Sequence, residues 1–101
     1  MPEVSNFTLE DALKRHFLRG EPVQPIDSVQ RYRIENFRLE CDPKVGATEV
    51  AEAVRDYYSL LFDCRPMNVE GSTATLTLIG NNIVFVTVTV VKGIALVSVV
   101  D

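Results

Sequence analysis

The chain has 101 residues, 47% of them apolar, and a formal net charge of −4 at pH 7. A chain of this length suits one domain, and its acid excess argues against duplex binding, which needs a concentrated basic surface. No apolar run approaches the roughly 20 residues that span a bilayer. Residues 1–8 lack the basic and apolar regions of a secretory signal, so we expect a cytoplasmic protein without a membrane span.

The first predicted element is a helix over residues 9–19. Thr8 is a suitable N-cap, and Gly20 is a suitable terminator. Pro22 and Pro25 then make a semi-rigid connector. This pattern divides the chain into residues 1–28, a helical arm with a proline-containing connector, and residues 29–101, an α+β core domain. The alternative, in which residues 1–28 pack within one compact domain, remains open.

Residues 29–41 predict a strand whose apolar side chains change parity near Glu35 and Asn36. A β-bulge there would bring both sets of apolar residues to one side of the sheet. A hairpin at the same place would set Arg33 opposite Arg38, a like-charge pair, so the bulge is favoured. A helix that starts at Ser28 is a further alternative.

Residues 49–63 predict a long helix capped by Thr48, because apolar residues recur along one side at helical spacing. Charged residues occupy the opposite side. The members of the apolar stripe are Val50, Ala53, Val54, Tyr57, Leu60, Leu61 and Cys64.

Residues 67–101 predict an antiparallel meander, because turn residues and alternating side chains agree on one register. A Lys92-Gly93 turn sets Val88 opposite Val97, and a Gly80-Asn81-Asn82 loop sets Leu76 opposite Val86. A Glu70-Gly71 turn would set Met67 opposite Ala74. The resulting inner face is aliphatic, and the helix over residues 49–63 is its natural cover.

These elements predict an α+β fold in which one long helix packs on a four- or five-stranded antiparallel sheet, with an N-terminal helical arm. The order of strand, helix and meander resembles cystatin-like or NTF2-like domains, in which a curved sheet grips a helix. The resemblance is one of topology alone, so it assigns no functional residue.

The chain offers few groups for metal or nucleophilic chemistry. It has one histidine, His16, on the apolar stripe of the first helix, and two cysteines, Cys41 and Cys64. The predicted second helix, roughly 24 Å long, separates the cysteines, so we expect two free thiols. We expect no metal and no cofactor.

Two charged clusters are better explained as solvated surface than as sites. Glu49, Glu52 and Asp56 share a helical side with Arg55. Arg31, Tyr32, Arg33 and Arg38 could contact single-stranded RNA through stacking on the tyrosine. Glu35 and Glu40 interleave with these arginines, and ion pairing explains them more simply, so nucleic acid is not the expected partner.

The other face of the meander carries no charge, whereas a solvated sheet face usually carries Lys, Glu or Arg. Its apolar members would form a patch as large as monomers leave bare. Either the first helix or residues 22–40 cover this face, or a second copy does. We favour a homodimer, with another protein as the alternative partner, and hence a non-enzymatic interaction module, because the first helix is too small to cover the face. The expected interface residues are Ile83, Phe85, Ile94, Leu96 and Val100.

The alternative function is that of a small-molecule-binding protein or enzyme. Its cavity would lie between the second helix and the curved sheet. The polar contacts expected there are Tyr57, Tyr58, Arg33 and Asp56. The sequence favours a non-enzymatic role, but it leaves open whether the protein is an enzyme.

Overall fold

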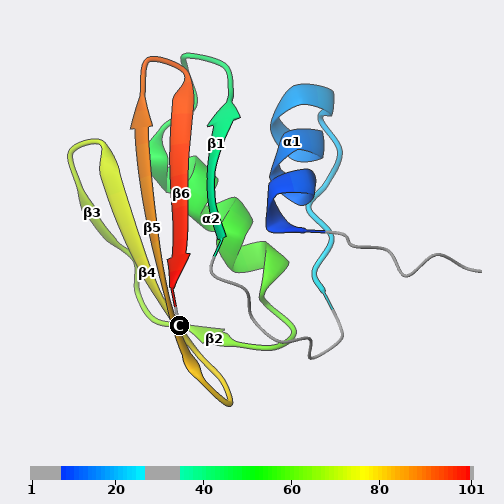
Figure 1. The fold of residues 1–101 in the computed structure, drawn as a ribbon, viewed down its shortest axis with the longest axis vertical. Coiled ribbons are helices and arrows are strands. Elements are labelled where there is room, and N and C mark those ends of the chain that lie inside the picture. Colours follow the sequence, from blue (N-terminus) through cyan, green and yellow to red (C-terminus); the bar gives the residue numbers. More distant parts are fainter. Residues whose placement is uncertain (1–7, 27–34, 101) are drawn as a thin grey trace, which may run out of the picture.

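The computed structural model describes residues 8–26 and 35–100 of the chain. It is an α+β structure in which a six-stranded antiparallel sheet carries its helices on one face (Figure 1). The sheet has one strand more than the four or five expected, because residues 63–64, which follow the second helix, also pair with the meander. The elements in chain order are α1 (Leu9–Arg19), β1 (Glu35–Glu40), α2 (Ala47–Tyr57), β2 (Asp63–Cys64), β3 (Asn68–Glu70), β4 (Thr73–Ile79), β5 (Ile83–Val91) and β6 (Ile94–Val100).

Helix α1 has the bounds and the caps that the sequence predicts. The Thr8 hydroxyl accepts a hydrogen bond from the Asp11 backbone N–H at 3.2 Å. At the other end Gly20 adopts a left-handed conformation with φ of 72°, and its N–H donates to the His16 carbonyl at 3.1 Å. Leu9 and Leu13 are fully buried in the same core as α2 and the sheet. The helix therefore packs on the core, while the expected domain boundary at residue 28 lies outside the described residues.

Strand β1 pairs with β6 without interruption, one residue opposite one residue from Glu35 to Glu40. The predicted bulge at Glu35 and Asn36 is therefore wrong, and so is the hairpin there, because the partner strand is the last one in the chain. Residues 29–34 lie outside the description. Leu39 is buried on the helix side, and Arg38 is exposed on the other side. The strand thus places Glu35, Phe37 and Leu39 on the helix side and Asn36, Arg38 and Glu40 on the other side.

Helix α2 has 11 residues and is shorter than the helix predicted over residues 49–63. It begins after Gly46, so Thr48 is not its cap. After Tyr57 the chain turns, and the Phe62 N–H donates to the Tyr58 carbonyl at 3.0 Å. Residues 63–64 then pair with β4, which requires an extended backbone and so ends the helical stretch. The apolar spacing continues past this point, which is why the sequence pattern predicts a longer helix.

The meander has the predicted register in its two longer hairpins. Val88 lies opposite Val97 and Leu76 lies opposite Val86. Lys92 and Gly93 both have positive φ, 50° and 79°, as a type I′ turn requires. The first hairpin is shifted by one residue from the prediction. Its turn is Gly71-Ser72, so Glu70 lies opposite Thr73 and Val69 lies opposite Ala74.

The core lies between α2 and the inner face of the sheet, with α1 closing it beside β1 (Figure 1). Val54 of α2, Leu76 of β4 and Val86 of β5 are all fully buried. The valines of β5 and β6 that the sequence pattern places inside, Val84, Val86, Val88, Val90, Val97 and Val99, are all buried. Helices therefore cover one face of the sheet, and the other face is left without a helical layer.

Candidate functional site

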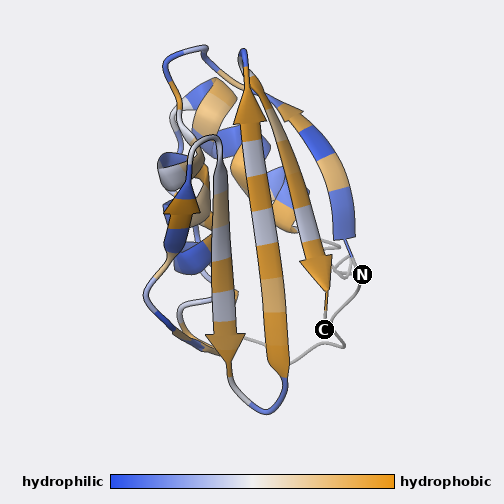
Figure 2. Cartoon of the chain, turned by 90° about the vertical axis from the view of Figure 1, so that its left-hand side faces the viewer, coloured by the Kyte–Doolittle hydropathy of each residue, from blue (hydrophilic) through white to orange (hydrophobic). Residues whose placement is uncertain are grey.

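We call the side of the sheet that faces away from the helices the outer face. On β4, β5 and β6 it has no charged residue, and Figure 2 shows these strands without hydrophilic bands. Exposure is high for its large apolar side chains: 51% for Ile83, 50% for Phe85 and 51% for Leu96. The outer-face residues of these strands are Thr73, Thr75, Thr77, Ile79, Ile83, Phe85, Thr87, Thr89, Val91, Ile94, Leu96, Ser98 and Val100.

All five predicted interface residues lie on the outer face. Ile83, Phe85, Leu96 and Val100 are exposed, and Ile94 is half-buried. Val91, which was not among the five, is 52% exposed and extends the apolar surface along β5. Its place at the end of a strand, beside the Lys92-Gly93 turn, made it a weak candidate from the sequence.

Within the described residues, no part of the chain lies over this face. Helix α1 packs against α2 and β1 on the helix side (Figure 1). The sequence left residues 22–40 as a second possible cover. Of these, Val23 and Ile26 pack against the core, residues 35–40 form strand β1 and extend the sheet, and residues 27–34 lie outside the description. Intrachain cover by α1 or by residues 35–40 is therefore excluded, and within the described residues the large apolar side chains of the outer face are exposed.

Charged side chains lie along both edges of the outer face. Arg38 and Glu40 extend it along β1, where they lie opposite Leu96 and Ile94 of β6. On the far side Glu70 of β3 lies opposite Thr73. Asp63 of β2 likewise lies opposite Ile79. An uncharged centre with a charged rim is the distribution found in protein–protein interfaces.

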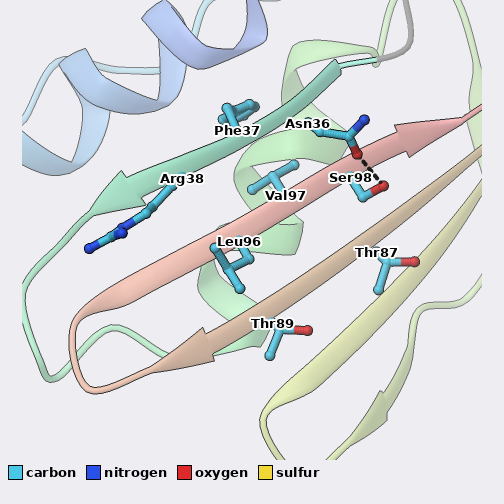
Figure 3. A pocket seen from close by; sticks show the side chains of 8 residues that line it. All are labelled: Asn36, Phe37, Arg38, Thr87, Thr89, Leu96, Val97 and Ser98. Carbon is cyan, nitrogen blue, oxygen red and sulfur yellow. Dashed lines mark hydrogen bonds between the residues drawn. The ribbon is translucent and has the colours of Figure 1, made fainter.

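Two pairs of polar side chains on this face interact with each other. The Ser98 hydroxyl donates to the Asn36 side-chain oxygen at 2.7 Å (Figure 3), and the hydroxyl oxygens of Thr73 and Thr89 lie 3.3 Å apart. Within the described residues, no buried side-chain nitrogen or oxygen lacks a partner. These two pairs lower the polar cost of removing water from the face, while the exposed hydroxyl groups of Thr75 and Thr87 remain available to a partner.

A hollow of about 400 Å³ opens on this face where β1, β6 and β5 run side by side (Figure 3). The small side chains of Ser98 and Thr87 form it, and the larger Leu96 and Arg38 border it. No carboxylate lines it. Its chemistry suits an apolar or hydroxyl-bearing side chain from a partner. The lining residues are Asn36, Phe37, Arg38, Thr87, Thr89, Leu96, Val97 and Ser98.

The residues expected to line a ligand cavity are not gathered at one opening. Tyr57 and Tyr58 are each 4% exposed, and their rings meet edge to face with centroids 4.9 Å apart. Burial, together with the nearby carboxylates of Glu35 and Asp11, raises the pKa of Tyr57 to about 12. Asp56 is exposed on the helix surface, and Arg33 lies outside the described residues.

The remaining candidate groups are dispersed. Cys41 and Cys64 are free and half-buried, and burial raises the pKa of both thiols. His16 donates through Nδ1 to the Glu21 carbonyl at 2.9 Å, which gives it a structural role at the end of α1. In residues 8–26 and 35–100, no three His, Cys, Asp or Glu side chains are grouped as a metal site would require.

Two further observations concern partners. None of the helices in the described ranges combines the length and the apolar character needed to cross a membrane. The arginines at 31 and 33 and Tyr32 of the RNA hypothesis lie outside the description, and Arg38, the remaining member, stands at the edge of the apolar outer face.

No protein-family model, no curated protein and no solved structure matches the chain. Function therefore has to be inferred from the chemistry of the surfaces just described.

Proposed function

We propose that this protein is a non-enzymatic assembly module that forms a homodimer through the outer face of its sheet. The observation that carries the proposal is the exposure of Ile83, Phe85 and Leu96 at about half of their surface, at the centre of the outer face, where β4, β5 and β6 carry no charge. An antiparallel sheet that meets water on one side normally alternates apolar and charged residues. Here threonines replace the charged residues, which favours burial against another protein surface.

The size of the face supports the same conclusion. Five strands about 4.8 Å apart and of 3 to 9 residues, at about 3.4 Å per residue, give a projected area of roughly 500 Å², and the side chains that stand on the face make its accessible area larger. A stable complex buries about 800 Å² on each partner. A second copy of the chain is the simplest partner, because no other protein is then required. In a two-fold dimer the apolar centre of the face packs against the same apolar centre of the second copy.

The test is the mass of the protein in solution, measured by light scattering coupled to size exclusion. We expect the wild type at twice the 11.3 kDa of one chain. A Phe85→Glu variant is expected at the monomer mass, because it buries a charge at the centre of the interface.

The matched control is Leu60→Glu, which places the same charge at a side chain that is 63% exposed and lies in the turn after α2. This variant should keep the dimer mass. Circular dichroism establishes that both variants are folded. A wild type that stays monomeric at every concentration tested, or a folded Phe85→Glu variant that stays dimeric, would refute the proposal.

The competing proposal is a small-molecule binder or enzyme with a cavity between α2 and the sheet, as in cystatin-like or NTF2-like topologies. The complete burial of Val54, Leu76 and Val86 weighs against it, because side chains fill the space that a ligand would need. A thermal-shift screen over metabolites tests this alternative. A ligand that raises the melting temperature of both the wild type and Phe85→Glu would favour it.

A further inference from the structure

The strand pairings place five outer-face residues in one row across the sheet. Arg38 on β1 lies opposite Leu96 on β6, which lies opposite Thr89 on β5. Thr89 lies opposite Thr73 on β4, which in turn lies opposite Glu70 on β3. One end of the row is a cation, the other end is a carboxylate, and the three positions between them are uncharged.

The middle of this row is β5, the longest strand of the sheet. A two-fold axis that runs along β5, in the plane between two sheets packed face to face, reverses the row in the second copy. Arg38 then lies over the partner's Glu70, and Glu70 lies over the partner's Arg38. Two identical ion pairs form, one at each edge, as a self-complementary interface requires.

In the neighbouring row the two end residues are also suited to each other. Asn36 on β1 and Asn68 on β3 are its two ends, with Ser98, Thr87 and Thr75 between them. The same axis sets Asn36 over the partner's Asn68, so amide meets amide. The centre of this row has small side chains only, which permits close approach of the two sheets. In the next row Phe85 lies on β5, next to the axis, and meets the partner's Phe85.

Arg38 and Glu70 are exposed, and neither makes an ion pair with another of the described residues. Packed sheets lie about 10 Å apart, a gap that an arginine and a glutamate side chain can span together at the rim. An axis perpendicular to the strands would instead bring β1 over β1 and β3 over β3. Arg38 would then lie over the partner's Arg38 or, with the axis level with Leu39, over the partner's Glu40. Glu70 would lie over no basic residue of β3, so the response to Glu70→Arg distinguishes the two axes.

We infer that the second copy docks about a two-fold axis along β5, with reciprocal Arg38–Glu70 ion pairs fixing its orientation. This inference rests on the proposed homodimer and adds its geometry. Charge pairs at an interface rim contribute modestly to affinity but select orientation and partner, since like charges in contact repel.

The test uses charge reversal of the two residues, alone and mixed. In Arg38→Glu both ion pairs become carboxylate pairs, and in Glu70→Arg both become arginine pairs. We expect each variant alone to dimerise with a Kd raised roughly tenfold. A mixture of the two variants restores both attractive pairs in the heterodimer, which should therefore dominate in native mass spectrometry, with one variant isotopically labelled.

The control is Arg55→Glu, an equal charge reversal on α2 and away from the sheet, which should leave the Kd unchanged. The double variant R38E/E70R should regain an affinity near that of the wild type. A dimeric wild type whose single variants dimerise normally, or whose mixture shows no preference for the heterodimer, would overturn the geometry and leave the homodimer standing. A monomeric wild type would instead refute the proposed function.

Discussion

Two leucines on opposite faces of the sheet provide a stringent test of which face is buried in the core and which is exposed. Leu76 on β4 is fully buried beneath α2, whereas Leu96 on β6 is 51% exposed on the outer face. Leu→Ala removes the same atoms at both positions. Only the position differs, so the difference in unfolding free energy measures burial.

The expected losses of unfolding free energy follow from this difference in burial. Truncation of a buried leucine typically costs 2–5 kcal/mol, because the lost transfer energy is joined by a cavity term, so we expect about 3 kcal/mol for Leu76→Ala. Leu96 has given up only half of its surface and leaves no closed cavity, so Leu96→Ala should cost about 1 kcal/mol at most in the monomer. For a domain of this size the melting temperature falls by about 4–8 °C per kcal/mol.

The assay is urea unfolding followed by circular dichroism, at a low chain concentration and at one about a hundredfold higher. Dimerisation stabilises the folded state by mass action. The cost of Leu96→Ala should therefore grow with concentration, while that of Leu76→Ala should stay constant. If Leu96→Ala costs as much as Leu76→Ala at the low concentration, Leu96 is inside and the register is wrong.

Three further predictions concern the helix caps, the turns and pH. Thr8→Ala should cost about 1 kcal/mol in urea unfolding, because it removes the hydroxyl that caps α1, whereas Thr48→Ala should cost much less, since Thr48 does not cap α2. Gly93→Ala should destabilise by about 1 kcal/mol more than Gly71→Ala: both glycines have positive φ, but only at Gly93 would a Cβ lie 3.0 Å from a backbone carbonyl. The pKa of Tyr57 is raised to about 12 in the folded protein from the ordinary tyrosine value of 10, so the unfolded chain ionises first and stability declines as pH rises from 10 to about 12. Wild type should lose up to roughly 2–3 kcal/mol over that range relative to Tyr57→Phe, and equal pH profiles for the two proteins would contradict this.

The sequence predicts best what local chemistry determines. Lys92 and Gly93 specify a tight turn by themselves, and the turn then fixes the register of β5 and β6. The caps of α1, Thr8 and Gly20, are equally local. The shift in the first hairpin has a local cause too: glycine at the first central position suits a type II′ turn, which moves the turn to Gly71-Ser72.

What the sequence does not reveal depends on distant pairing. Residues 35–40 pair with the last strand, and nothing local to them identifies that partner. The end of α2 at Tyr57 is set by the pairing of residues 63–64 with β4, so helical spacing alone overestimates its length. The edge charges of the site were missed for the same reason. Arg38 and Glu70 belong to one row only when both edges of the sheet are known.

The most direct test of the account is isotope-filtered NMR on a mixture of labelled and unlabelled chains, which detects only contacts between copies. Burial of the outer face against a second copy predicts intermolecular contacts from the ring of Phe85 and from the methyl groups of Leu96 and Val100. It predicts none from Val54 or Leu76, which are fully buried between α2 and the sheet in each copy. Intermolecular contacts confined to the helix side of the sheet would contradict the proposed burial of the outer face. The absence of any intermolecular contact at high protein concentration would contradict it as well.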